Sequence, residues 1–107
     1  MSDRFFDIAK NTKVLEELKS DLLSTVATLY KAIVKGTQEK IIESLAAIII
    51  LTYLIGRRLG VKFFQIDQAV KEQLRFAQNK YTDIENWFND ISSLKEYIND
   101  MNNGGKE

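Results

Sequence analysis

Residues 43–58 read ESLAAIIILTYLIGRR, and this stretch decides what kind of fold the chain can form. Its middle, residues 45–55, holds no charged residue. As an α-helix these residues cover about 16 Å, at 1.5 Å per residue. The hydrocarbon core of a membrane is about 30 Å thick. Glu43 before the run and Arg57 after it prevent a longer apolar helix, so the stretch predicts a buried helix in a protein with no membrane segment.

The composition limits both the fold and the chemistry. A chain of 107 residues is long enough for one domain with one core, and we expect a single domain over residues 1–107. Fifteen basic residues balance fifteen acidic ones, so no overall field attracts nucleic acid. The absence of cysteine and histidine excludes thiolate or imidazole metal ligands and a Ser-His-Asp triad. The first residues, MSDRFFDIAK, lack the apolar run of a secretory signal, and we expect a cytoplasmic protein.

The spacing of apolar residues predicts an all-α fold of four helices. They are expected at about residues 7–35, 38–59, 64–79 and 82–102, with a tight connection at Gly36 that makes the first two an antiparallel hairpin. Thr82 and Glu85 have the spacing of a capping box at the start of the fourth helix. The predicted domain has its core at about residues 13–80, a C-terminal amphipathic helix at about 82–102 and a frayed tail at 103–107.

The second helix lacks the polar face that a simple bundle shows to water. Because residues 45–55 are apolar all round, we expect a second copy of the chain to cover their outer side, in a symmetric dimer or a higher oligomer. The alternative is a monomer in which the fourth helix folds back over this side.

The order of these features resembles a known family. In residues 22–60, LLSTVATLYKAIVKGTQEKIIESLAAIIILTYLIGRRLG, the positions Leu29, Ala32–Ile33, Gly36 and Leu45 fit the frame of the MazG-type all-α nucleoside triphosphate pyrophosphatases. The resemblance extends over about residues 15–75 and implies a MazG-like helical bundle. It also implies that Lys71 and Arg75 occupy basic positions that face substrate phosphates in that family.

The same frame implies that the catalytic metal site is missing. Enzymes of the family hold Mg²⁺ with two glutamates on the first helix and a glutamate and an aspartate on the second, and this chain has Thr25, Thr28, Ser44 and Ala47 at those positions. Magnesium prefers carboxylate oxygens, which none of these four residues supplies. The resemblance therefore predicts no metal, no cofactor and no catalytic residue.

Carboxylates elsewhere in the hairpin do not replace the lost ligands. Glu17 and Asp21 on the first helix could pair only with Glu39 and Glu43 on the second. In a hairpin that turns at Gly36, Glu43 and Asp21 are about 12 Å apart along the axis, too far to share a metal site. We therefore expect Glu39 and Glu43 to be solvated carboxylates.

Three hypotheses for the function follow. The first is a MazG-like protein without pyrophosphohydrolase activity, an oligomeric helical module that binds a protein partner or a nucleotide. The alternative is an active nucleoside triphosphate pyrophosphohydrolase with a non-standard Mg²⁺ site, in which Glu43, Lys71 and Arg75 act on the substrate. The third is nucleic-acid binding by basic and aromatic residues between Arg57 and Tyr81, which the balanced net charge disfavours.

Overall fold

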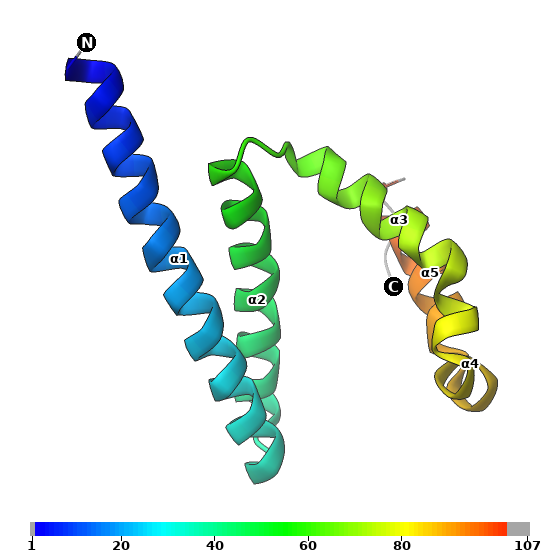
Figure 1. Cartoon of the computed structure of the whole chain (residues 1–107). Coiled ribbons are helices and arrows are strands. Elements are labelled where there is room, and N and C mark those ends of the chain that lie inside the picture. The colour runs from blue at the N-terminus through cyan, green and yellow to red at the C-terminus, as the bar shows by residue number, and fades with distance from the viewer. Residues whose placement is uncertain (1, 103–107) are drawn as a thin grey trace. The chain divides into compact units, whose positions relative to one another are not determined.

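The structure, a computed structural model, describes the backbone of residues 2–102 and the side chains of residues 7–101. The predicted tail, 103–107, lies outside the described residues. Within the described part there are five α-helices and no strand (Figure 1), which confirms the all-α class. The helices are α1 (Ser2–Lys35), α2 (Gln38–Arg58), α3 (Phe63–Lys80), α4 (Thr82–Phe88) and α5 (Asp90–Asn102).

The chain divides into two compact units, Met1–Phe63 and Phe64–Glu107. The first contains α1 and α2, and the second contains nearly all of α3 together with α4 and α5. The single domain expected from the chain length stays a prediction, and each unit is described by itself.

The first unit is the predicted antiparallel hairpin, drawn from blue through cyan to green in Figure 1. At its turn Gly36 has a φ of 69°, which an L-residue rarely adopts. The Gly36 N–H donates to the Ile33 carbonyl and the Thr37 N–H donates to the Ala32 carbonyl, the two bonds of a Schellman motif. At the open end, Asn11 Nδ2 donates to the Arg58 carbonyl at 3.1 Å and Arg58 Nη1 donates back to Asn11 Oδ1 at 3.3 Å. The two helices are therefore fixed at both ends.

The seam between α1 and α2 is narrow and built from one stripe of each helix. Ala32, Ser44 and Leu51 are buried there, and residues such as Leu22 and Ile48 on the same stripes are half-buried. The other side of α2 carries large apolar side chains that are exposed. We name this set the outer apolar face; it consists of Ile42, Leu45, Ile49, Ile50 and Leu54.

The predicted fourth helix is two helices, so the predicted count of four is wrong. Asn89 ends α4 with a φ of 59° and α5 begins at the next residue. Asparagine tolerates this left-handed conformation better than any residue except glycine, which explains why the chain can turn there. The predicted capping box is also absent, because Thr82 Oγ1 donates to the Asn79 carbonyl and Glu85 reaches forward to α5.

None of the helices in residues 2–102 is long and apolar enough to cross a membrane.

Two large aromatic side chains of α4 lie outside the core. The rings of Trp87 and Phe88 pack edge to face, with their centres 6.4 Å apart, and both side chains are largely exposed.

Candidate functional site

The four positions where the family resemblance implies metal ligands lie at matching heights in the hairpin. Thr28 and Ser44 are each eight residues from Gly36, and Thr25 and Ala47 are each eleven residues from it. Because the helices are antiparallel, the first pair lies about 12 Å and the second about 16 Å from the turn. The four positions therefore occupy one region of the hairpin, a single helical turn in length.

Three of these four side chains face the seam and one does not. Ser44 is 4% exposed, and Thr25 and Ala47 are half-buried. Thr28 is exposed, and its Oγ1 donates to the Ser24 carbonyl at 3.0 Å. The region consequently offers hydroxyls and a methyl group but no carboxylate, and it does not fit Mg²⁺, which needs several charged oxygen ligands.

The stray carboxylates do not supply an alternative site. Glu39 and Glu43 are exposed on α2, and Glu43 forms an ion pair with Lys40 at 3.8 Å. Exposed pairs of this kind contribute little to stability and leave both groups hydrated. Across the described residues, no group of three or more histidines, cysteines, aspartates or glutamates could hold a metal ion.

The second unit contains a polar cluster that joins α3, α4 and α5. Glu85 Oε2 accepts hydrogen bonds from Ser92 Oγ and, at 2.6 Å, from Gln78 Nε2, while Glu85 Oε1 accepts the Ser92 backbone N–H at 3.1 Å. The bond from the Ser92 hydroxyl contributes most to holding the pKa of Glu85 below its ordinary value. On the other side of Gln78, its Oε1 accepts a bond from Lys95 Nζ at 3.4 Å. The cluster fixes the start of α5 against α3 and holds the Lys95 side chain.

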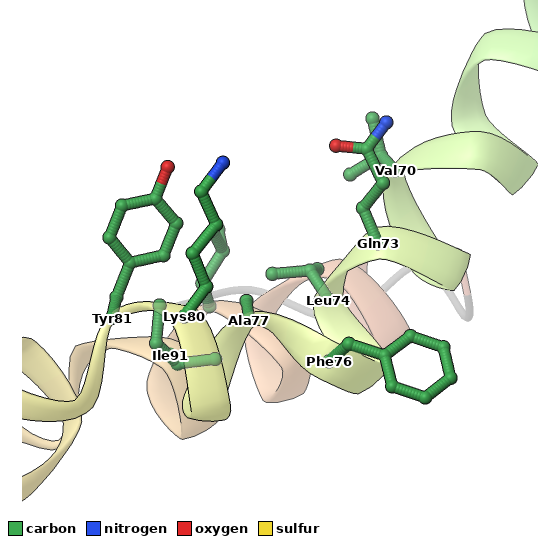
Figure 2. Close-up of a pocket in the computed structure, with 9 residues that line it drawn as sticks. Val70, Gln73, Leu74, Phe76, Ala77, Lys80, Tyr81 and Ile91 are labelled. Carbon is green, nitrogen blue, oxygen red and sulfur yellow. The ribbon is translucent and has the colours of Figure 1, made fainter.

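An apolar groove lies along the contact between α3 and α5 (Figure 2). Its volume is about 520 Å³. Leu74 and Ile91 are buried at its floor. Figure 2 shows the Lys80 and Tyr81 side chains standing next to each other at one end, and Lys80 Nζ lies 5.2 Å from the centre of the Tyr81 ring. The groove therefore has an apolar floor and one basic rim.

A smaller cleft, of about 290 Å³, shares Leu74 with the apolar groove and is lined by charged residues. The structure brings Lys71 and Arg75, the two predicted phosphate-binding residues, together in this cleft and adds Lys95 from α5. Sequence reasoning missed Lys95, because its position depends on the turn at Asn89 and on the bond to Gln78. We name the three residues Lys71, Arg75 and Lys95 the basic triad.

The basic residues considered for nucleic-acid binding are divided between the two units, and those of the second unit line two different clefts. Lys80 lines the apolar groove rather than the cleft of the basic triad. Arg57 belongs to the first unit, where its guanidinium lies 4.8 Å from the centre of the Phe63 ring.

The fold and these positions define a class: an all-α protein built on an antiparallel hairpin, with neutral residues in its seam. Comparison with protein families then gives the particular family. The sequence profile described as the MazG-like family matches residues 8–91, and the chain belongs to this family. No curated protein and no solved structure matches the chain.

Proposed function

We propose that this chain is a cytoplasmic MazG-like protein without nucleoside triphosphate pyrophosphohydrolase activity, acting as an oligomeric helical module that binds a protein partner or a nucleotide. One observation supports this most: Thr25, Thr28, Ser44 and Ala47 stand where the family resemblance implies four carboxylates. No cofactor is needed for such a role.

The physics of the seam supports the same proposal. Carboxylates at the three positions that face the seam would repel one another unless a cation lay between them, and burying one without a partner costs several kcal/mol. Small neutral side chains remove this repulsion, as the burial of Ser44 illustrates. The hairpin then packs without a metal ion, and the chemistry that a metal supports is lost.

The outer apolar face supports the oligomeric part of the proposal. Ile49 and Ile50 are more than half exposed, at 59% and 58%, next to exposed Leu45 and Leu54. An exposed surface of this kind on a hairpin is typical of protein interfaces, and a second copy related by a two-fold axis could bury it against its own equivalent. In such a dimer the predicted interface is α2, between Leu45 and Ile55.

The experiment that tests the proposal restores the ligands. The variant Thr25→Glu, Thr28→Glu, Ser44→Glu, Ala47→Asp is expected to bind Mg²⁺ in isothermal titration calorimetry, whereas the natural chain is expected to bind none. Magnesium binding by the natural chain at millimolar or lower concentration would contradict the proposal. Sedimentation equilibrium on the natural chain tests the oligomer, and a monomeric mass at all concentrations would contradict that part.

The alternative, an active pyrophosphohydrolase with a non-standard metal site, needs other carboxylates to hold the metal. The nearest candidates on α2, Glu39 and Glu43, are exposed, and neither belongs to a cluster that could hold an ion within the described residues. These observations favour the binding module over the enzyme.

A further inference from the structure

We infer that residues 82–102 form a two-state switch. One state is the bent form seen here, in which Glu85 holds α4 and α5 at an angle (Figure 1), and the other is a single straight helix in which the hydrogen bonds of Glu85 are broken. The evidence comes from the second unit alone and does not depend on the chemistry of the hairpin. The switch is therefore independent of the proposed function and is tested separately.

The amino-acid sequence of this segment suits one uninterrupted helix. Residues 82–102 contain no proline and no glycine, and the large apolar residues recur at steps of three and four across the break. These residues are Ile84, Trp87, Phe88, Ile91, Leu94, Ile98 and Met101. In a straight helix they share one face over about 26 Å, at 1.5 Å per residue. In the bent form that face is divided, because Ile91 is buried whereas Trp87 and Phe88 are largely exposed.

A single residue interrupts the helix. Asn89 has a φ of 59° and a ψ of 28°, whereas Phe88 before it and Asp90 after it are helical. The left-handed conformation is less favourable than the right-handed helical one for every L-residue, including asparagine. The bent form therefore needs contacts outside Asn89 to hold it.

Glu85 supplies these contacts. Its Oε1 accepts the Ser92 backbone N–H at 3.1 Å, and its Oε2 accepts the Ser92 hydroxyl and, at 2.6 Å, Gln78 Nε2. In a straight helix Glu85 and Ser92 are seven residues apart, about 10 Å along the axis, so the bonds between them cannot form. Hydrogen bonds to an ionised carboxylate are stronger than those to a neutral amide. Removing the charge of Glu85 therefore destabilises the bent form selectively.

Little packing opposes the change of form. Among the residues of the second unit that the structure describes, only Leu74 and Ile91 are buried. Segments with few buried apolar contacts open at a small cost in free energy. The two largest side chains of α4, Trp87 and Phe88, contact each other at the surface, and the bent form does not bury them. We therefore expect the two forms to be close in free energy.

Straightening changes what the second unit presents to a ligand or a partner. In the bent form Lys95 Nζ lies 3.4 Å from Gln78 Oε1, and Lys95 shares the cleft of the basic triad. In a straight helix Lys95 is thirteen residues after Thr82, about 20 Å, whereas Gln78 is four residues before Thr82, about 6 Å. Lys95 and Gln78 are then at least about 13 Å apart along the helix axes, whichever way the helix points. The basic triad is therefore assembled in the bent form, and the continuous apolar face in the straight one.

The test is a distance measurement between α3 and α5 in the full chain by pulsed electron paramagnetic resonance. The chain has no cysteine, so Asn79→Cys and Glu96→Cys, at exposed positions next to Gln78 and Lys95, give two unique sites for spin labels. We expect a short distance from the bent form as the main population, and a second distance that is longer by about 10 Å or more. Glu85→Gln is expected to raise the ratio of the long to the short distance about tenfold, because charge-assisted hydrogen bonds are lost from the bent form alone.

Substitutions at Asn89 are expected to move the two populations in opposite directions. Asn89→Ala favours the helical conformation and should increase the long distance, whereas Asn89→Gly accepts positive φ and should decrease it. The matched control is Asp83→Asn, which removes a carboxylate charge from an exposed position of the same helix. It is expected to leave the ratio of the two distances unchanged within twofold.

Three results would overturn the switch. The first is one distance that is the same in the labelled natural chain, in Glu85→Gln and in Asn89→Ala. The second is an equal shift in Asp83→Asn and Glu85→Gln. The third is a loss of helicity in Glu85→Gln, measured by far-UV circular dichroism, because Glu85 would then be needed for folding rather than for the choice between two folded forms. None of these results bears on metal binding or pyrophosphate release by the chain.

Discussion

A substitution at Ser44 is the most sensitive test of whether the seam of the hairpin tolerates a buried charge. Ser44 is 4% exposed, whereas Thr28, another of the four family positions, is exposed on α1. Replacing Ser44 by glutamate places a carboxylate between α1 and α2 without a partner. Replacing Thr28 by glutamate places the same group in water, and is the matched control.

The cost of the Ser44→Glu substitution can be worked out from its two components. A buried carboxylate can avoid its charge by taking up a proton, so the electrostatic cost at pH 7 is limited to about 3.7 kcal/mol, from a reference pKa of about 4.3 and 1.36 kcal/mol per pKa unit. The larger side chain adds about 1–3 kcal/mol of overpacking, partly relieved if it bends toward solvent. We expect a loss of about 3–5 kcal/mol in the free energy of unfolding at pH 7.

The effect of pH on this variant has a definite sign. Burial raises the folded-state pKa of the new glutamate, so between the two pKa values the folded state binds more protons than the unfolded state. The stability of Ser44→Glu relative to the natural chain therefore falls as pH rises above about 4.3. At pH 4 only the overpacking cost of about 1–3 kcal/mol remains.

The assay is urea unfolding followed by far-UV circular dichroism at pH 4 and pH 7. Thr28→Glu is expected to change the free energy of unfolding by no more than about 0.5 kcal/mol, as exposed substitutions do. If Ser44→Glu costs no more than Thr28→Glu at pH 7, the seam is not the closed neutral contact described above.

Three further predictions concern the core, the outer apolar face and the polar cluster. Leu51→Ala, in the seam, should lower the free energy of unfolding by about 2–4 kcal/mol in urea titrations; a loss below about 1 kcal/mol would show that Leu51 is not part of the core. Ile50→Asp, on the outer apolar face, should lower the mass in sedimentation equilibrium while preserving helicity, and an unchanged oligomer would exclude this face as the interface. Glu85→Gln should remove the acid-sensitive part of the stability of α3–α5: the pKa of Glu85 is lowered in the folded state, so its contribution is present above its unfolded pKa and is lost as pH falls through the folded pKa. Thermal midpoints measured between pH 2 and pH 7 should then vary less in the variant, and parallel curves would contradict this role.

The hairpin was predictable because its signals are local. Gly36 follows a long apolar stripe, and only a residue that accepts positive φ can end a helix in the motif seen there. The ends of α2 and α3 also lie within one residue of their expected bounds, since a period of 3.6 over many residues admits one interpretation.

The break at Asn89 was not predictable from periodicity, because the apolar stripe continues through it at helical spacing. Ile91 is buried and keeps that spacing, although the chain turns between α4 and α5. The signal that sequence reasoning passed over is the pair Asn89-Asp90, which combines a residue tolerant of positive φ with a residue favoured at helix starts.

Part of the candidate site could not be predicted, because it depends on contacts between helices that the spacing of residues along the sequence does not reveal. Lys71 and Arg75 are one turn apart on one helix, so their common face followed from the sequence. Lys95 joins them only because Glu85 bonds Gln78 and Ser92 rather than capping its own helix. These hydrogen bonds of Glu85 also explain why the capping box predicted from the sequence is absent.

The most direct test of the central claim is pyrophosphate release from a panel of ribo- and deoxyribonucleoside triphosphates, with Mg²⁺, with Mn²⁺ and without metal. The chain with Thr25, Thr28, Ser44 and Ala47 is predicted to release none above background under any of these conditions. The contradicting result is pyrophosphate release that requires the metal, copurifies with the chain through successive columns and is lost when a residue of the chain is substituted. Such release would contradict the claim that this family member lacks a catalytic centre.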